Sequence, residues 1–108
     1  MDISSRTERV RKMERLLDES SEAVSQLGSA LEKYEAALGG MKELFEYYSG
    51  GEWLDDLRAD DAGLFPHGLK RGVLSEDAVF DLMAEDLAAR ERMRKLAEEK
   101  QGEEEIRG

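Results

Sequence analysis

The chain has 108 residues, a size that predicts one domain with a modest hydrophobic core. Its net charge of −10 disfavours direct binding to nucleic acid or to an anionic membrane surface, because both rely on a cationic face. The lack of cysteine excludes disulfides, thiolate catalysis and cysteine-based zinc sites. With no signal-peptide core and no apolar run as long as a membrane span, we expect a cytoplasmic protein.

The composition favours an all-α fold. Charged residues make up 39% of the chain, there is one proline, and no stretch alternates strictly between apolar and polar residues. We predict a single helical domain over 1–98, with a flexible polar tail at 99–108. It would combine a long N-terminal heptad helix, a short middle helix and loop, and a C-terminal helix that packs back as an antiparallel hairpin or a three-helix bundle.

The strongest pattern is an apolar seam with alternating 3–4 spacing, which is typical of a coiled-coil helix. It has two interleaved sets of positions, each with a step of seven residues: Ile3, Val10, Leu17, Val24, Leu31, Leu38 and Phe45, then Arg6, Met13, Ser20, Leu27, Tyr34, Met41 and Tyr48. Only Arg6 and Ser20 are polar. The seam predicts a helix over about 4–49, begun by a capping box of Ser5 and Glu8.

Gly39 and Gly40 leave two alternatives for this helix. Each glycine costs about 1 kcal/mol relative to alanine inside a helix, so the helix could end there and form a compact monomeric bundle. The seam nevertheless keeps its phase across both glycines, from Leu38 to Met41. We favour a continuous helix, straight or kinked, because a break would remove any need to keep phase.

The middle of the chain predicts a short helix over about 52–62 between clear stop signals. Ser49-Gly50-Gly51 precedes it, and Gly63 suits a left-handed cap at its end. Phe65 to Gly68 fits a type I turn with proline second and glycine fourth. Leu69 to Arg71 fits one helical turn closed by Gly72.

The last predicted helix spans about 75–98. Ser75 is its expected N-cap, followed by Glu76 and Asp77 in the first turn, and Leu74 and Val79 fit a hydrophobic staple. Its apolar face repeats at helical spacing and comprises Val79, Leu82, Met83, Leu87, Met93 and Leu96, with Phe80 adjoining.

The stretch from Tyr47 to Leu82 resembles a family of small bacterial proteins classed as a domain of unknown function. The residues that carry the resemblance are Tyr47-Tyr48, Glu52-Trp53-Leu54, Asp60, Gly63-Leu64, Pro66 and the run Leu69-Lys70-Arg71-Gly72-Val73-Leu74-Ser75-Glu76-Asp77. The resemblance extends over about 9–97 and supplies no activity or site. It implies that the loop before the last helix is a defined structural element.

Aromatic residues gather around the predicted junction between helices: Tyr47, Tyr48, Trp53, Phe65 and Phe80. They fit either a small core that fixes the junction or a partner-binding hot spot, where Trp and Tyr are enriched. Lys70 and Arg71 could hold an anion beside Gly72, or pair with neighbouring carboxylates.

No pattern of catalytic residues, metal ligands or cofactor-binding motifs emerges. His67, the only histidine, fits an exposed turn residue. The carboxylates Asp55, Asp56, Asp60 and Asp61 fit a solubilising surface better than a calcium loop, although Asp56 and Asp60 share a helical face. Asp77, Asp81 and Glu85 form a stripe that would suit either a solvated face or mimicry of phosphates toward a basic protein partner.

The relative lengths of the helices supply the functional prediction. An antiparallel last helix would reach only to about residue 24, leaving the seam around Val10, Met13, Leu17 and Val24 uncovered. An exposed seam favours a second chain. We therefore predict a homodimeric, non-enzymatic interaction or scaffold protein without a cofactor; the alternative is an acidic inhibitor that binds a basic protein.

Overall fold

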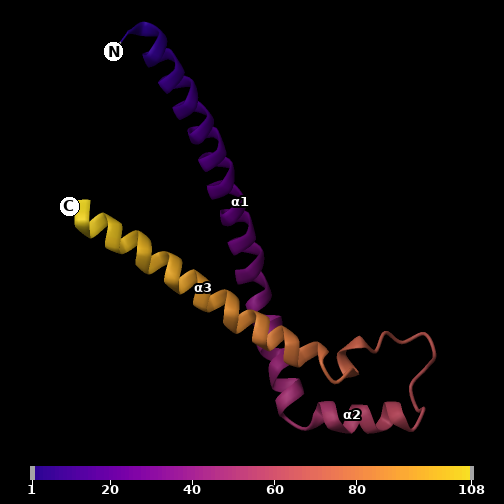
Figure 1. Ribbon diagram of the computed structural model, residues 1–108. Helices are drawn as coiled ribbons and strands as arrows, with labels where there is room; N and C mark the ends of the chain where they lie inside the picture. Colours follow the sequence, from indigo (N-terminus) through magenta and orange to yellow (C-terminus); the bar gives the residue numbers. More distant parts are fainter. Residues whose placement is uncertain (1, 108) are drawn as a thin grey trace. The chain divides into compact units, whose positions relative to one another are not determined.

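The computed structural model describes the backbone of residues 2–107 and the side chains of residues 2–99. The described residues form α1 (Ile3–Ser49), α2 (Glu52–Asp61), a 3-10 helix η1 (Gly72–Leu74) and α3 (Ala78–Arg107), with no strand among them. Figure 1 shows this order along the ribbon. The expected all-α class, with a long first helix, a short middle helix and a C-terminal helix, is confirmed.

The first helix begins earlier than the capping box predicted. The backbone N–H of Ser5 donates to Oδ1 of Asp2 at 2.8 Å, so Asp2 occupies the N-cap and Ile3 is the first helical residue. This hydrogen bond lowers the pKa of the Asp2 carboxyl. The predicted box of Ser5 and Glu8 is wrong: Ser5 lies inside the helix, and the Glu8 carboxylate pairs with Arg11 at 2.7 Å.

The helix continues through Gly39 and Gly40, which confirms the favoured alternative. No atom outside the local helix backbone and the adjoining residues lies within 4 Å of the place where a Cβ would stand at either glycine, so close packing does not require them. Because the helix is continuous, the other residues of this span outweigh the poor helix propensity of the two glycines. The helix ends at Ser49, as the following glycines predicted, and Gly51 adopts a left-handed φ of 99°.

The end of α2 is a Schellman motif. The N–H of Leu64 donates to the carbonyl oxygen of Ala59 at 3.0 Å, and that of Gly63 to the carbonyl oxygen of Asp60 at 2.9 Å. Gly63 has a φ of 72°, the left-handed conformation that its place in the sequence predicted.

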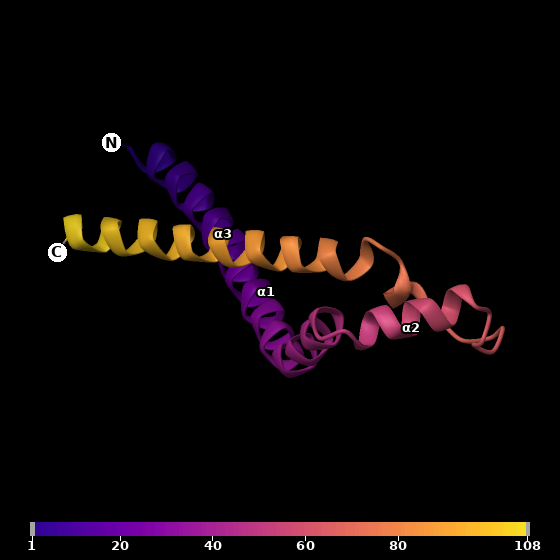
Figure 2. The same cartoon turned by 90° about the horizontal axis from the view of Figure 1, so that it is seen from below.

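The loop differs from the sequence-based expectation at two points. Its hydrogen-bonded turn joins the carbonyl oxygen of Pro66 to the N–H of Leu69 at 3.2 Å, one residue later than the predicted turn, because proline restricts its own φ but does not fix the register. The helical turn predicted at Leu69 to Arg71 is wrong, since the 3-10 helix η1 occupies Gly72–Leu74 instead. The loop returns along α2, so that η1 lies beside this helix (Figure 2).

The last helix begins at Ala78, three residues after the predicted N-cap. Ser75 has extended backbone angles and closes η1 by donating its N–H to the carbonyl oxygen of Gly72. The carbonyl oxygen of Asp77 accepts the N–H of Asp81 at 2.8 Å, which places Asp77 at the helix start. Leu74 and Val79 are 7% and 2% exposed, so among the side chains of residues 2–99 the two residues of the predicted staple form the buried core.

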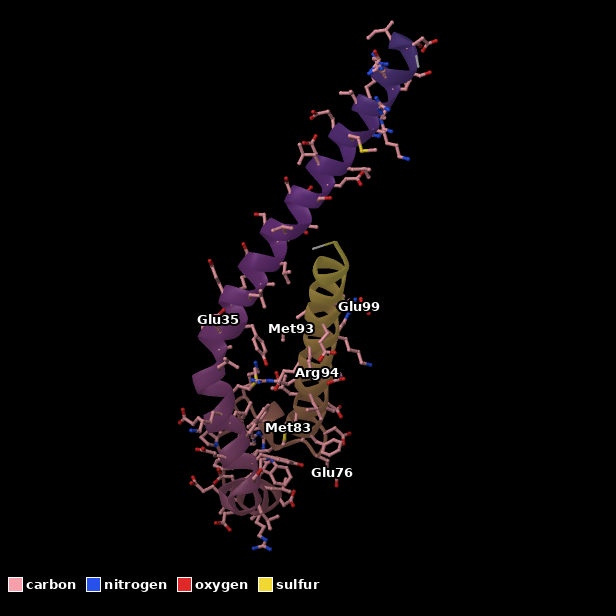
Figure 3. The ribbon with its side chains drawn as sticks, turned by 90° about the vertical axis from the view of Figure 1, so that its left-hand side faces the viewer. Glu35, Glu76, Met83, Met93, Arg94 and Glu99 are labelled. Atoms are coloured by element: carbon pink, nitrogen blue, oxygen red, sulfur yellow. The ribbon has the colours of Figure 1, made fainter. Side chains whose placement is uncertain are left out.

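The helix α3 runs to Arg107, beyond the end expected near Glu98. Arg94 pairs with Glu91 and Glu98 along the helix, and Figure 3 labels this arginine on α3. Side chains from Lys100 onward lie outside the described residues, so the flexible tail at 99–108 stays a prediction.

The chain forms two units, Met1–Met41 and Lys42–Gly108. The first consists of the N-terminal part of α1. The second holds the last turns of α1 together with α2, the loop, η1 and α3. The boundary between them falls after Met41, one residue beyond Gly39 and Gly40.

Candidate functional site

The predicted self-association seam is a continuous exposed face of the first unit. Val10, Met13, Leu17 and Val24 are 57%, 51%, 59% and 70% exposed. Ile3, Leu16 and Leu27 are also exposed, so the apolar stripe is wider than the four predicted residues. Figure 3 shows side chains standing out along this part of the helix. An apolar face of this length is available for contact with another protein surface.

One end of the seam is hollowed. Ile3, Arg6, Thr7, Val10 and Arg11 line an open, largely apolar depression of about 250 Å³. Four of them stand at sequence offsets of zero, three, four and seven, which is the arrangement of four residues that receives a side chain from a facing helix.

The second candidate surface is the aromatic junction of the second unit, built by three contacts. The Tyr47 hydroxyl donates to Oδ2 of Asp56 at 2.6 Å. The rings of Tyr48 and Trp53 meet edge to face with centroids 5.0 Å apart. Nε1 of Trp53 donates to the carbonyl oxygen of Val73 at 2.9 Å. Together these contacts fasten the end of α1 to α2, and α2 to η1.

The electrostatics of the junction centre on Tyr47. The hydrogen bond to Asp56, with partial burial of the ring and the nearby negative charges of Asp56 and Glu52, raises the pKa of Tyr47 to about 12. The phenol therefore stays protonated and acts as a fixed donor. Such a group supplies structure rather than acid–base catalysis near neutral pH.

Arg71 forms an ion pair with Asp60 across the loop. The neighbouring Lys70 is exposed, and Phe65 is half-buried. The pairing supports the interpretation that Arg71 neutralises a local carboxylate, whereas anion binding by Lys70 and Arg71 stays a prediction. Trp53 and Tyr47 are likewise engaged in holding the junction, and a partner-binding role for this set is a prediction too.

The acidic residues considered as cation ligands are distributed among other contacts. Asp56 accepts from Tyr47 and Asp60 from Arg71. Within the described part of the chain, no three histidine or carboxylate side chains converge as a metal site would require. Asp77, Asp81 and Glu85 are exposed at the start of α3, and their recognition by a basic protein stays a prediction.

The sequence did not identify Asp56, Asp60 or the Val73 carbonyl as the partners of the junction. The sequence placed Asp56 and Asp60 on one helical face but favoured a solubilising surface there, and it did not single out Tyr47 as the donor to Asp56 or Asp60 as the carboxylate that pairs with Arg71. Leu16 was also missed, although it is exposed beside Leu17 and Met13 and follows the seam at helical spacing.

Comparison with protein families decides where this chain belongs. A family model described as a domain of unknown function, DUF4298, matches residues 10–96. The chain belongs to the DUF4298 family. The DUF4298 match spans most of α1 and all of α2, the loop and η1, and it confirms the resemblance to a family of unknown function. Among curated proteins and solved structures, none matches the chain. None of the helices in the described residues is long and apolar enough to cross a bilayer.

Proposed function

We propose that this DUF4298 protein is a non-enzymatic helical interaction protein that associates with itself through the seam of α1. The observation that supports the proposal is the joint exposure of Val10, Met13, Leu17 and Val24 on one face of the first unit. Leaving such a stripe in water is unfavourable, at roughly 25 cal/mol for each Å² of apolar surface. A second helix with the same stripe would cover it and be covered in return, as in symmetric dimers.

The features of the second unit fit the same proposal. Its hydrogen-bonding side chains at the junction are used within the unit: Tyr47 with Asp56, Trp53 with Val73, and Arg71 with Asp60. A nucleophile with its base, or a protonatable group poised near neutral pH, would favour an enzyme. The junction instead has the contacts of a rigid support.

The test is the mass of the protein in solution. We expect sedimentation equilibrium at tens of micromolar to give a dimer for the natural chain and a monomer for the double variant Val10→Glu, Leu17→Glu. The matched control is Ser25→Glu, Ser29→Glu, which adds the same charge to α1 outside the seam and should leave the dimer intact. A natural chain that sediments as a monomer at this concentration would refute self-association.

A further inference from the structure

Two charged side chains of opposite sign flank the exposed seam, one on each side. Arg9 directly precedes the seam residue Val10, and Glu14 directly follows the seam residue Met13. In a heptad repeat these are the two positions beside the apolar residues, where charges set the choice and orientation of a partner helix. Both side chains are exposed. The other flanking positions between residues 3 and 27 carry no charge: Thr7, Leu16, Ser21 and Ala23.

We infer that the second copy lies parallel to the first and in register, so that Arg9 of each copy pairs with Glu14 of the other. This inference rests on the proposed self-association and specifies its orientation. Glu14 stands five residues after Arg9. In a parallel pair of helices, positions with this spacing on opposite sides of the seam face each other across the interface. The two-fold symmetry of the dimer forms the pair twice.

An antiparallel copy would not bring these charges together. Reversing one helix sets each side of the seam against the same side in the partner, so Arg9 would face uncharged residues. If the overlap covered the whole stretch from Ile3 to Leu27, the two Glu14 side chains would lie close together at the centre of the interface. Like charges at facing positions are destabilising, so the flanking charges favour the parallel orientation.

The shapes of the seam residues fit the same orientation. Ile3, Val10 and Val24 are branched at Cβ, and they are three of the four residues of their set between positions 3 and 27. In the other set the apolar residues, Met13 and Leu27, are not branched at Cβ. Side chains branched at Cβ in the first set, with unbranched ones in the second, favour a parallel dimer of two helices.

The polar seam residue Ser20 also fits the parallel register. In that register it faces Ser20 of the partner copy, and each hydroxyl can donate to the other. In the antiparallel overlap the same hydroxyl would face Val10, an aliphatic side chain that accepts no hydrogen bond. A hydroxyl removed from water without a partner costs free energy, so the matched layer is the more favourable one.

One layer of the parallel dimer carries a cost. The hollow at the start of α1 is lined by Arg6 together with Ile3, Thr7 and Val10, and in register it receives Arg6 of the partner copy. The two like charges oppose each other. Their aliphatic stems can nevertheless lie against the apolar walls while the guanidinium groups reach water. This layer is at the end of the seam, where solvent screens charges more than at the centre, where the antiparallel dimer would place Glu14.

A charge reversal within one chain tests the pairing. Arg9→Glu should raise the dimer dissociation constant about tenfold, because two attractive pairs become repulsive. Adding Glu14→Arg to the same chain exchanges the two charges and should restore the dissociation constant. Arg15→Glu, which makes the same change at an outer position of the heptad, is the matched control and should leave it nearly unchanged. Sedimentation equilibrium over a concentration series measures all four chains.

Either of two results of this experiment would overturn the parallel pairing. One is a dissociation constant that Arg9→Glu leaves unchanged. The other is a loss that Glu14→Arg fails to rescue, since Arg9 and Glu14 do not meet in an antiparallel dimer.

The lack of cysteine in the chain allows an independent test by single-site spin labelling. Glu8→Cys, Arg15→Cys and Glu22→Cys place labels at the same outer heptad position in three successive heptads. Dipolar spectroscopy should give the same distance between paired labels at all three sites. In an antiparallel dimer the axial offset of the paired labels shifts by about 21 Å with each heptad, from a rise of 1.5 Å per residue, so no register gives three equal distances.

The labelling experiment separates the two ways in which the inference can fail. Unequal distances in chains that sediment as dimers would overturn the parallel orientation and leave self-association intact. Sedimentation of the natural and labelled chains as monomers, with no intermolecular coupling, would instead refute the self-association on which the orientation rests.

Discussion

The indole Nε1 of Trp53 donates a hydrogen bond to the carbonyl oxygen of Val73, twenty residues further along the chain. One partner belongs to α2 and the other to η1. The bond therefore sets the place at which the loop returns to α2, and Leu74, the next residue, is buried together with Val79.

Replacing Trp53 with phenylalanine tests this bond. The change keeps an aromatic ring for Tyr48 but removes the donor to Val73, and we expect the free energy of unfolding to fall by about 1 kcal/mol or somewhat more. Urea denaturation followed by circular dichroism measures it at a fixed protein concentration. Leu64→Ala, at a highly exposed loop position, is the control and should change stability by less than about 0.5 kcal/mol.

The phenol of Tyr47 predicts a specific loss of stability at high pH. Folding raises its pKa from 10.0 to about 12, so the folded state favours the protonated form. The resulting stabilisation is fully present below pH 10 and is lost as the pH rises through 12. Relative to Tyr47→Phe, the natural chain should be about 1 kcal/mol more stable at pH 8, and this advantage should vanish by pH 12.

Urea denaturation across this pH range would measure the difference. Asp56→Asn keeps an acceptor for the Tyr47 hydroxyl but removes the negative charge. With this change the pKa of Tyr47 should rise less on folding, so the stability contributed by the phenol should be lost over a narrower pH range. A constant difference between the natural chain and Tyr47→Phe from pH 8 to 12 would contradict the role of the hydrogen bond to Asp56.

The ion pair between Asp60 and Arg71 should contribute little by itself. The Arg71 side chain is 40% exposed, so solvent and salt screen the attraction. A double-mutant cycle of Asp60→Asn and Arg71→Gln should give a coupling energy below about 1 kcal/mol that decreases further in 1 M salt. A larger coupling that is insensitive to salt would show that the pair is more shielded than its exposure indicates.

Alanine at Gly39 or Gly40 should stabilise the protein. Both positions are helical with open space where the Cβ of an alanine would stand, so each change should add about 1 kcal/mol. Gly51→Ala is the matched contrast: its φ of 99° strains any L side chain, and this variant should lose at least about 1 kcal/mol. Thermal unfolding of the three variants would rank them, and a destabilised Gly39→Ala would argue against open space there.

The sequence predicted the features that depend on neighbours a few residues apart. The phase of Leu38 and Met41 indicated that the helix crosses Gly39 and Gly40, and Gly63 marked the end of α2. Such signals are local, because a heptad seam or a left-handed cap is complete within one or two helical turns.

The features that were missed depend on distant partners. The place of η1 beside α2 depends on the contacts of Trp53 with Val73 and of Asp60 with Arg71, which no local pattern encodes. Ser75 and Asp77 are both acceptable caps, and Ser5 and Asp2 likewise. Which of two such residues caps a helix depends on the backbone conformation of the whole helix end, so the residue type alone did not determine the cap.

The glycine pair in α1 also has a consequence for motion. Helices ordinarily open from their ends. In α1, Gly39 and Gly40 also lower the intrinsic helix stability in the interior, close to the boundary between the two units. Amide hydrogens of the residues that follow the pair should exchange with solvent faster than those near Val24. Transient opening there would let the seam and the junction reorient independently while each keeps its own structure.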